Sequence, residues 1–509
     1  MTTTKPTTAL ATERLREELS YLKLPSAAWP HPPQGTGELD VAIIGAGMFG
    51  IAVAVALVLK GVKNIRLFDS SEQGRSGPWT TYARMHTLRS PKDLPGLSFG
   101  IRALTFRAWY EAVYSVEAWE ALYKIPNGVW QDYLDWIAQA FELPIEHQTR
   151  IREFSVSPQG VTLLRDDDAS LAARRLVIAT GRSGAGGVSV PSFIDPALFP
   201  ARAAHTTDTI DFSALAGRHV AVLGAGSSAW DNAATALEQG AARVTMYARR
   251  SYLPQINKAR GYIYPGFIAG WHALPAADQW AVATYLDDTP PPPPHETVLR
   301  TLAAGEGRFE LRLNSRIEAI DQEGSQVRVK LADRTEQADF LIVGTGFQVD
   351  LARDPLFARV ADRVALWRDR FEPAGEAKYR HLGLYPWLGS GFELQEIGKD
   401  DGASAPIGSD NSSGSSCIPS GIGVDRENVG LGRNPCNRVC QVPDLWRVRK
   451  RSDRQEIPRT LQIEDCDAGR NNGERKQRLW SCCRCHRDGC GGCRHNGAIG
   501  VRPDCCDCG

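Results

Sequence analysis

Two stretches of the chain share one order of apolar and polar positions: an apolar strand, a glycine turn, a helix and a second strand. The first begins at Asp40, where DVAIIG predicts a strand, residues 48–61 a helix and NIRLFD the second strand. The second begins with HVAVLGAG (219–226) and returns with ARVTMYARR (242–250). This order forms a βαβ unit, whose strands lie parallel in one sheet. The pattern therefore predicts an α/β protein with two such units.

The intervening stretches predict further elements. Leucines at helical spacing predict a short helix over residues 11–24, followed by a proline-rich linker over 25–37. Aromatic-rich stretches between 104 and 142 predict helices whose aromatic side chains form a packing core, with a pocket lined by Trp109, Tyr114, Trp119 and Trp130 as the alternative. Five consecutive prolines, 290–294, predict an extended surface loop. The remaining strands are expected at RRLVIATG, FELRL, RIEAI, QVRVKL and ADFLIVGTGF.

One apolar run resembles a membrane span. Residues 41–59 carry no charge, but three glycines near their start favour a buried strand, a turn and a buried helix. The N-terminus has no apolar signal-peptide core, so we expect a cytoplasmic protein with no membrane span. Hydrophobic residues make up 42% of the chain, and 59 basic side chains balance 59 acidic ones. This balance argues against a nucleic-acid partner.

All 12 cysteines lie at or after Cys417, so residues 1–416 hold no disulfide or CxxC redox centre. From residue 407 onward there is no Phe or Tyr, and 15 arginines stand against two lysines. A zinc module is an alternative there, but only one clean CxxC is present, and we expect no metal site. We interpret residues 407–509 as an irregular tail, either disordered or translated out of frame.

The first glycine turn has the features of a dinucleotide site. In GAGMFG, Gly45 permits the tight turn, Gly47 lets the backbone approach a pyrophosphate, and Gly50 lets helix and strand pack closely. The helix N-terminus adds a partial positive charge. Asp69 ends the next strand, where its carboxylate can accept hydrogen bonds from ribose hydroxyls. This arrangement suits FAD.

The second turn, GAGSSA, repeats the pattern with Gly224, Gly226 and an alanine at the third position. Ser227 and Ser228 open its helix, at the predicted phosphate site. The following strand ends in Arg249 and Arg250 in place of an acid. Arginine can bind a 2′-phosphate, which an acid would repel, so this site is expected to prefer NADPH. The alternative is an ordinary solvated loop.

With two glycine turns in this order, residues 38–406 resemble the class B flavoprotein monooxygenases, which include the flavin-containing and Baeyer–Villiger monooxygenases. SGPW, ending at Trp79, is similar to the GGxW segment near the flavin. LRSPKD is similar to TNxPKE, with Arg89 in place of the family asparagine. ATG (179–181) and GTGF, which contains Gly346, resemble the strand ends that flank the inserted domain. Only Phe199 and His205 match the FxGxxxHxxxW fingerprint.

The resemblance implies an FAD domain with an inserted NADPH domain. The boundaries expected from it are a helix and linker over 1–38, FAD-binding segments over 39–185 and 310–406, an NADPH-binding domain over 186–309, and the tail. It also implies that NADPH reduces FAD and that O₂ adds at flavin C4a, giving a (hydro)peroxyflavin that oxygenates a small organic substrate. A cationic Arg89 near the flavin is then a candidate catalytic residue, or else a surface arginine.

Two alternatives to a monooxygenase remain at this point. One is an NADPH-dependent flavoprotein reductase, and the other is a non-catalytic cofactor-binding protein, because the family-like sequence stops near residue 406. The substrate and the oligomeric state are not determined by these patterns.

Overall fold

A computed structural model describes residues 7–29, 38–262, 264–288, 290–372, 377–398 and 417–419 of the 509-residue chain. The chain divides into two compact units, 1–447 and 448–509, and the second lies outside the described residues. Apart from residues 417–419, so does the tail that we interpreted as disordered or out of frame. All described helices and strands therefore belong to the first unit.

The first sheet contains the first βαβ unit. Its strand order is β3-β2-β1-β6-β5-β4, in which β1 pairs in parallel with both β2 and β6. The apolar helix α2 (Met48–Leu59) connects β1 and β2. The strands are β1 (Leu39–Ile44), β2 (Ile65–Phe68), β3 (Ile145–Glu146), β4 (Ile151–Ser157), β5 (Gly160–Arg165) and β6 (Ser170–Ile178).

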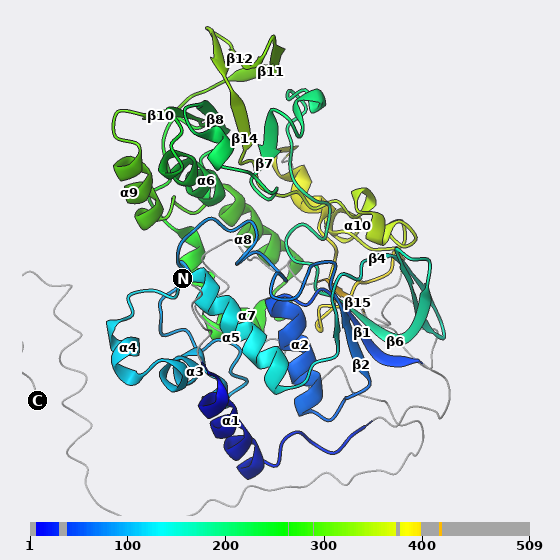
Figure 1. Cartoon of the computed structure of the whole chain (residues 1–509). Helices are drawn as coiled ribbons and strands as arrows, with labels where there is room; N and C mark the ends of the chain where they lie inside the picture. The colour runs from blue at the N-terminus through cyan, green and yellow to red at the C-terminus, as the bar shows by residue number, and fades with distance from the viewer. Residues whose placement is uncertain are drawn as a thin grey trace, which may run out of the picture. The chain divides into compact units, whose positions relative to one another are not determined.

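A short strand from the tail joins this sheet. β15 (Cys417–Pro419) pairs in parallel with the second half of β6, where Ile418 lies opposite Val177. These three residues thus form a regular strand within the tail that we expected to be irregular. The position is adjacent to the strand that precedes Ala179, at the carboxyl edge of the sheet where the first glycine turn lies (Figure 1).

The second sheet is entirely parallel, with strand order β10-β9-β8-β14-β7. Helices α6 (Ser227–Glu238) and α9 (His295–Ala304) pack together beside it (Figure 1). Its strands are β7 (Ala203–His205), β8 (His219–Leu223), β9 (Arg243–Tyr247), β10 (Phe309–Arg312) and β14 (Phe340–Val343).

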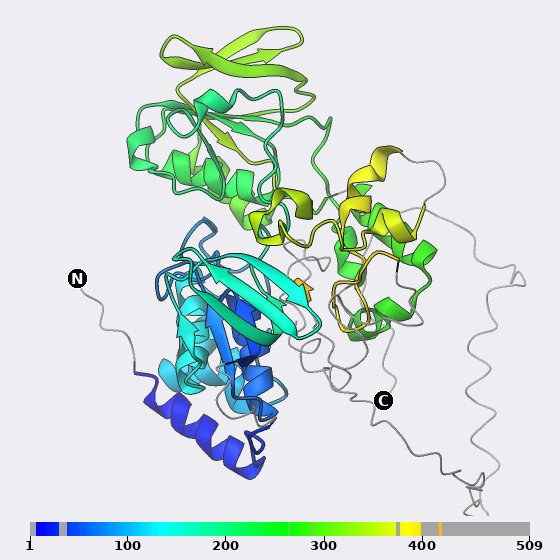
Figure 2. The same cartoon turned by 90° about the vertical axis from the view of Figure 1, so that its right-hand side faces the viewer.

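The expected return to the first domain at residue 310 is wrong. β10 spans that boundary and pairs with β9, and β14 lies between β8 and β7. A three-stranded antiparallel sheet separates these two strands along the chain and packs against the second sheet (Figure 2). Local patterns identify strands but not which sheet they join. The small sheet consists of β11 (Ile317–Glu323), β12 (Gln326–Leu331) and β13 (Thr335–Ala338).

The helices confirm the amphipathic and aromatic patterns. The N-terminal helix is present as α1 (Ala9–Tyr21). The aromatic region folds into α3 (Phe106–Val113), α4 (Val116–Ala121) and α5 (Asn127–Ala140). Trp109 and Trp130 are fully buried in one cluster with the apolar face of α2, so these rings form a core. The other α-helices are α7 (Pro265–Gly270), α8 (Ala276–Asp288) and α10 (Trp367–Arg370).

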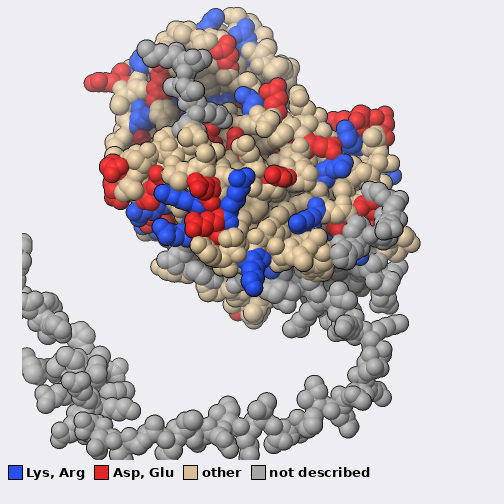
Figure 3. All heavy atoms as spheres, turned by 60° about the horizontal axis from the view of Figure 1, so that its bottom comes forward, with Lys and Arg blue, Asp and Glu red and all other residues tan. Residues whose placement is uncertain are grey.

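The apolar run over residues 41–59 divides into β1, the glycine turn and α2. Among the described residues, no helix has the length and apolar character needed to cross a membrane. Acidic and basic side chains are interspersed on the face shown in Figure 3, without a continuous patch of either sign.

Candidate functional site

Glycine occupies the three glycine positions of the GxGxxG motif in the first turn for different structural reasons. Gly45 has a φ of +100°, and a Cβ there would overlap the carbonyl oxygen of Ala179. A Cβ on Gly50 would overlap the carbonyl oxygen of Gly45. A Cβ on Gly47 would meet nothing nearer than the Cα of Gly77, at 3.7 Å. The protein's own packing therefore requires glycine at the first and third positions, while the second faces space that a ligand can occupy.

Asp69 stabilises this turn from the end of β2. The side chain is buried, its Oδ2 accepts a hydrogen bond from the backbone N–H of Ala46 at 2.7 Å, and its Oδ1 accepts one from Ser71 at 2.8 Å. A carboxylate oxygen can accept more than one hydrogen bond. Asp69 can therefore hold the turn and still accept a ribose hydroxyl, and the ribose contact stays a prediction.

Two buried polar atoms beside this turn fit a bound cofactor. Ser76 Oγ and Trp79 Nε1 have no hydrogen-bond partner among the described residues, and they flank Gly77, which lies against Gly47. The Trp79 ring also contacts Trp130 edge-on, with ring centroids 6.3 Å apart. Buried polar groups are normally hydrogen-bonded, so these atoms are suited to a ligand with polar atoms. The residues present thus fit the FAD predicted from the turn.

The second turn has the same arrangement, except that the small and the larger residue at one helix–strand contact are exchanged. Gly224 has a φ of +103° and lies against the carbonyl oxygen of Gly344, while no atom lies within 4 Å of a Cβ on Gly226. The third position is Ala229, and a Cβ on Gly344 would approach its Cβ to 2.7 Å. In the first turn the corresponding pair is Gly50 and Ala179. Each turn therefore has one alanine and one glycine at this contact, which explains why Ala229 is tolerated.

Helix α6 begins at Ser227, with Gly226 as its N-cap residue, so the backbone N–H groups of its first turn face the second glycine turn. Arg249 is exposed and Arg250 half-buried just after β9. Neither guanidinium forms an ion pair with any residue that the structure describes. Both charges are thus available to an anionic ligand, and their binding to a 2′-phosphate stays a prediction.

The two chain segments that connect the sheets pair with each other. Ser189 donates a backbone hydrogen bond to the carbonyl of Gly346 at 2.9 Å, and Asp350 donates one to Ala185 at 2.7 Å. Gly346 has a φ of +82°, and a Cβ there would have no neighbour within 4 Å. Its position is open, as a cofactor-contacting turn requires, but the contact itself stays a prediction.

His205, the fingerprint histidine, lies at the end of β7 and is buried. Its ring meets Phe347 edge-on at 6.0 Å, and its Nδ1 lies 2.9 Å from Thr207 Oγ1. Burial lowers the pKa of His205, which favours the neutral ring at neutral pH. The histidine thus packs against the connecting segment that carries Phe347.

Arg89, the candidate catalytic residue, forms an ion pair with a residue that the sequence analysis missed. Its Nη2 lies 2.5 Å from Oδ2 of Asp231 on α6, and the two side chains are 10% and 5% exposed. Thr297 of α9 donates a hydrogen bond to Oδ1 of the same carboxylate at 2.9 Å. The charge of Arg89 is therefore balanced by the carboxylate of Asp231, on the helix that follows the second glycine turn. A catalytic role for Arg89 stays a prediction.

More polar contacts surround this pair. Arg84 donates to the carbonyls of Thr206 and Asp208, at 2.9 and 2.7 Å, and Arg300 of α9 donates to the carbonyl of Arg84 at 2.9 Å. Arg300 also forms a bidentate ion pair with Glu238. A cavity of about 190 Å³ lies here between residues 85–89 and α9. Sequence spacing gave no signal for these contacts, because their partners lie far apart in the chain: 122 residues for Arg84 and Thr206, 216 for Arg300 and Arg84, and 62 for Arg300 and Glu238.

Replacing Asp231 with leucine is expected to destabilise the protein by about 3–5 kcal/mol, because it leaves the Arg89 charge buried without its counter-charge. The double variant Arg89→Met/Asp231→Leu is expected to recover most of that loss. Urea unfolding of the three proteins measures both effects. If the double variant is stable yet does not turn over, Arg89 or Asp231 has a role beyond stability. If it is no more stable than Asp231→Leu alone, the ion pair is not the reason for the loss.

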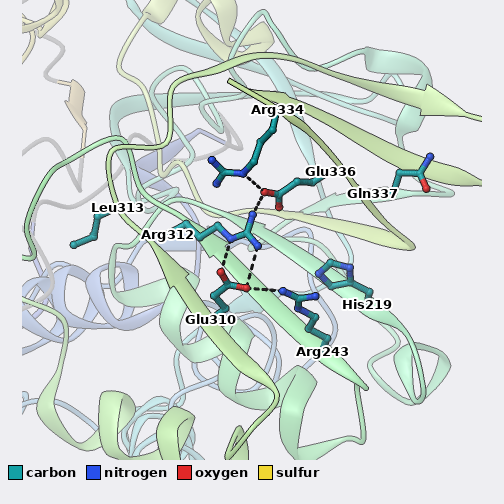
Figure 4. A pocket seen from close by; sticks show the side chains of 8 residues that line it. All are labelled: His219, Arg243, Glu310, Arg312, Leu313, Arg334, Glu336 and Gln337. Atoms are coloured by element: carbon teal, nitrogen blue, oxygen red, sulfur yellow. Dashed lines mark hydrogen bonds and ion pairs between the residues drawn. The ribbon is translucent and has the colours of Figure 1, made fainter. Parts of the chain in front are cut away.

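A larger groove, of about 670 Å³, runs along strands β9 and β10 of the second sheet (Figure 4). It extends from His219 and Arg243, at the amino ends of β8 and β9, to Arg312 at the carboxyl end of β10, which lies opposite Tyr247. Arg312 and Arg243 bind Glu310 and lower the pKa of its carboxyl to about 2. The charges of this groove therefore satisfy one another, and we assign it no chemistry.

Comparison with known proteins agrees with this architecture. A family model described as pyridine nucleotide-disulphide oxidoreductase matches residues 42–265. A FAD-dependent urate hydroxylase from Xanthomonas campestris pv. campestris is 38% identical over 395 residues, covering 76% of this chain and 83% of that protein. No cysteine precedes Cys417, so residues 1–416 cannot form the disulphide centre that the family description mentions.

Among solved structures, an ornithine hydroxylase from Pseudomonas aeruginosa has a TM-score of 0.59 at 15% identity, covering 79% of this chain and 97% of that one. An L-lysine 6-monooxygenase from Pseudomonas syringae has a TM-score of 0.56 at 18% identity, covering 79% and 96%. At these identities the likeness concerns the fold, and it confirms the predicted α/β class with two Rossmann-like domains.

Proposed function

The chain belongs to the class B flavoprotein monooxygenase family, as its motifs predicted, and on that premise we propose that it is an NADPH- and FAD-dependent hydroxylase of urate or a closely similar nitrogen heterocycle. It is an oxidoreductase by membership of this family. The use of NADPH, the flavin-C4a route of oxygen transfer and the substrate are the parts that we propose.

The observation that carries the cofactor assignment is the pair of glycine turns: a Cβ on the second glycine would meet no atom closer than 3.7 Å at Gly47 and none within 4 Å at Gly226. The first turn, with Asp69, Ser76 and Trp79, would hold FAD. The second, with the N-terminus of α6 and the arginines Arg249 and Arg250, would hold NADPH. The substrate assignment rests on the urate hydroxylase that is 38% identical to this chain.

The proposed reaction consumes one NADPH, one proton, one O₂ and one substrate molecule. It yields NADP⁺, water and the hydroxylated substrate, so two electrons come from NADPH and two from the substrate ring. Urate has no C–H bond, so the hydroxyl adds to an unsaturated ring carbon and a ring N–H loses its proton. Bound FAD would supply the transfer of those electrons to oxygen, which the protein's side chains cannot perform. The chain's contribution is to hold both cofactors by their phosphates, at the N-termini of α2 and α6.

The test follows NADPH oxidation, O₂ uptake and urate consumption in the full-length purified protein. We expect equal molar amounts of all three, with little hydrogen peroxide. Peroxide formation without loss of urate would instead favour the NADPH-dependent reductase. If the protein neither binds flavin nor oxidises NADPH, the enzyme assignment is wrong for this chain, and the non-catalytic alternative holds.

A further inference from the structure

One face of α5 carries two buried amides that the proposed chemistry has not used. Asn127 and Gln131 are one helical turn apart, so they lie on one face of α5, and Trp130, three positions after Asn127, borders this face. Asn127 is 7% exposed and Gln131 is 4% exposed. Amides are rarely buried to this extent unless their polar atoms are bonded.

The orientation of both amides is fixed by their donors. Asn127 Nδ2 donates to the carbonyls of Met85 and Ala83, at 2.6 and 3.3 Å. Gln131 Nε2 donates to Oδ1 of Asp135 at 2.8 Å. Rotating either amide would place its oxygen against another oxygen. Asn127 Oδ1 and Gln131 Oε1 are thus acceptors, and neither has a partner among the described residues.

This face of α5 borders the first glycine turn. α5 packs against α2, the helix that begins at that turn (Figure 1). Trp130 contacts Trp79, and the segment carrying Trp79 also carries Gly77, whose Cα lies next to Gly47. The two acceptors therefore lie beside the segment whose donor, Trp79 Nε1, is also without a partner in the described structure.

We infer that Asn127 Oδ1 and Gln131 Oε1 accept hydrogen bonds from sugar hydroxyl groups of bound FAD, those of the ribityl chain or of the adenosine ribose. This inference rests on the proposed function, which places FAD at the first turn. Free acceptors require a ligand that donates. FAD has few donors, and most of them are these hydroxyls, whereas its phosphates only accept. A buried water at each oxygen is the competing explanation.

The test uses Gln131→Met, which keeps the side-chain length and removes the acceptor. We expect FAD to bind the apoprotein about tenfold more weakly, the usual effect of one lost buried hydrogen bond. Gln131→Ala is the second variant, should methionine prevent folding. Flavin fluorescence quenching gives the dissociation constant, and the ratio of flavin to protein absorbance gives the occupancy, so neither readout needs activity.

Two controls separate binding from stability. Gln279→Met removes another buried amide, which donates to the carbonyls of Trp271 and Leu274, and should lower the melting temperature without weakening FAD. The exchanged pair Gln131→Glu/Asp135→Asn keeps both the internal hydrogen bond and an acceptor oxygen, and should bind FAD within about threefold of wild type. The inference is overturned if Gln131→Met and Gln279→Met bind FAD equally well, as buried water would predict.

FMN and ADP then distinguish the two sugars. If the ribityl chain is the donor, Gln131→Met should weaken the binding of FMN and leave the binding of ADP unchanged. If the ribose is the donor, it should weaken the binding of ADP and leave that of FMN unchanged. A loss of FAD affinity with neither FMN nor ADP affected would overturn the assignment to sugar hydroxyls. If the wild-type protein itself binds no FAD, the proposed function fails, and that result differs from unchanged binding in the variants.

Discussion

Gly47→Val is expected to give a folded protein that retains no FAD, with affinity reduced by at least about a hundredfold. The nearest protein atom to a Cβ at this position is the Cα of Gly77, 3.7 Å away, so a Cβ makes only an ordinary contact in the unliganded fold. Gly47 also has a φ of −71°, which any residue can adopt. The branched side chain would instead occupy the place where the pyrophosphate approaches the backbone. Absorbance at the flavin band per mole of protein measures the loss.

Its matched controls lie in the same turn. Gly50→Val would force its Cβ onto the carbonyl oxygen of Gly45, so we expect it to lower stability before cofactor binding is even considered. Gly47→Ala should give an intermediate FAD affinity. Thermal unfolding separates the two kinds of damage. Stoichiometric FAD in folded Gly47→Val would show that the pyrophosphate lies elsewhere.

The double variant Arg249→Ala/Arg250→Ala is expected to reduce kcat/KM for NADPH by about ten- to a hundredfold while changing NADH little. Each charge-assisted hydrogen bond to a phosphate contributes about 1.5–3 kcal/mol. NADH lacks the 2′-phosphate, so its binding does not depend on these hydrogen bonds. Neither guanidinium is held by an ion pair with a described residue, so both can reorient toward the ligand. Steady-state oxidation of both nucleotides measures the preference.

Arg243→Ala is the control for this pair. It lies on the same strand, β9, but at the opposite end, where it binds Glu310. We expect it to leave the ratio of NADPH to NADH unchanged. If kcat/KM falls equally for both nucleotides in the double variant, the arginines do not bind the 2′-phosphate. They then belong to an ordinary solvated loop, the alternative that the sequence also allowed.

Several features could be predicted from the sequence because short-range chemistry determines them. A strand, a GxGxxG turn and a helix follow from apolar spacing and from the conformational freedom of glycine, so both βαβ units and both turns were found. The buried aromatic core over α3, α4 and α5 followed from helical spacing. The exposed arginines after β9 could be located because a strand end fixes their position.

Other features depended on which distant segments meet. β10 and β14 have ordinary strand sequences, and only pairing with β9 and β8 assigns them to the second sheet. Arg89 was predicted near flavin from its segment alone, but its guanidinium binds Asp231, 142 positions along the chain. An acid within an ordinary helix gives no local signal of such a partner.

The sequence by itself determined the two dinucleotide-binding units and their glycine turns, because each depends on residues close together in the chain. Only the tertiary structure decided which strands complete each sheet, why Ala229 is accommodated by Gly344, and where Arg89 directs its charge. It also decided that the oxygens of Asn127 and Gln131 lack partners among the described residues. Burial and hydrogen-bond satisfaction belong to the packed molecule, since they depend on contacts between segments that the chain keeps far apart.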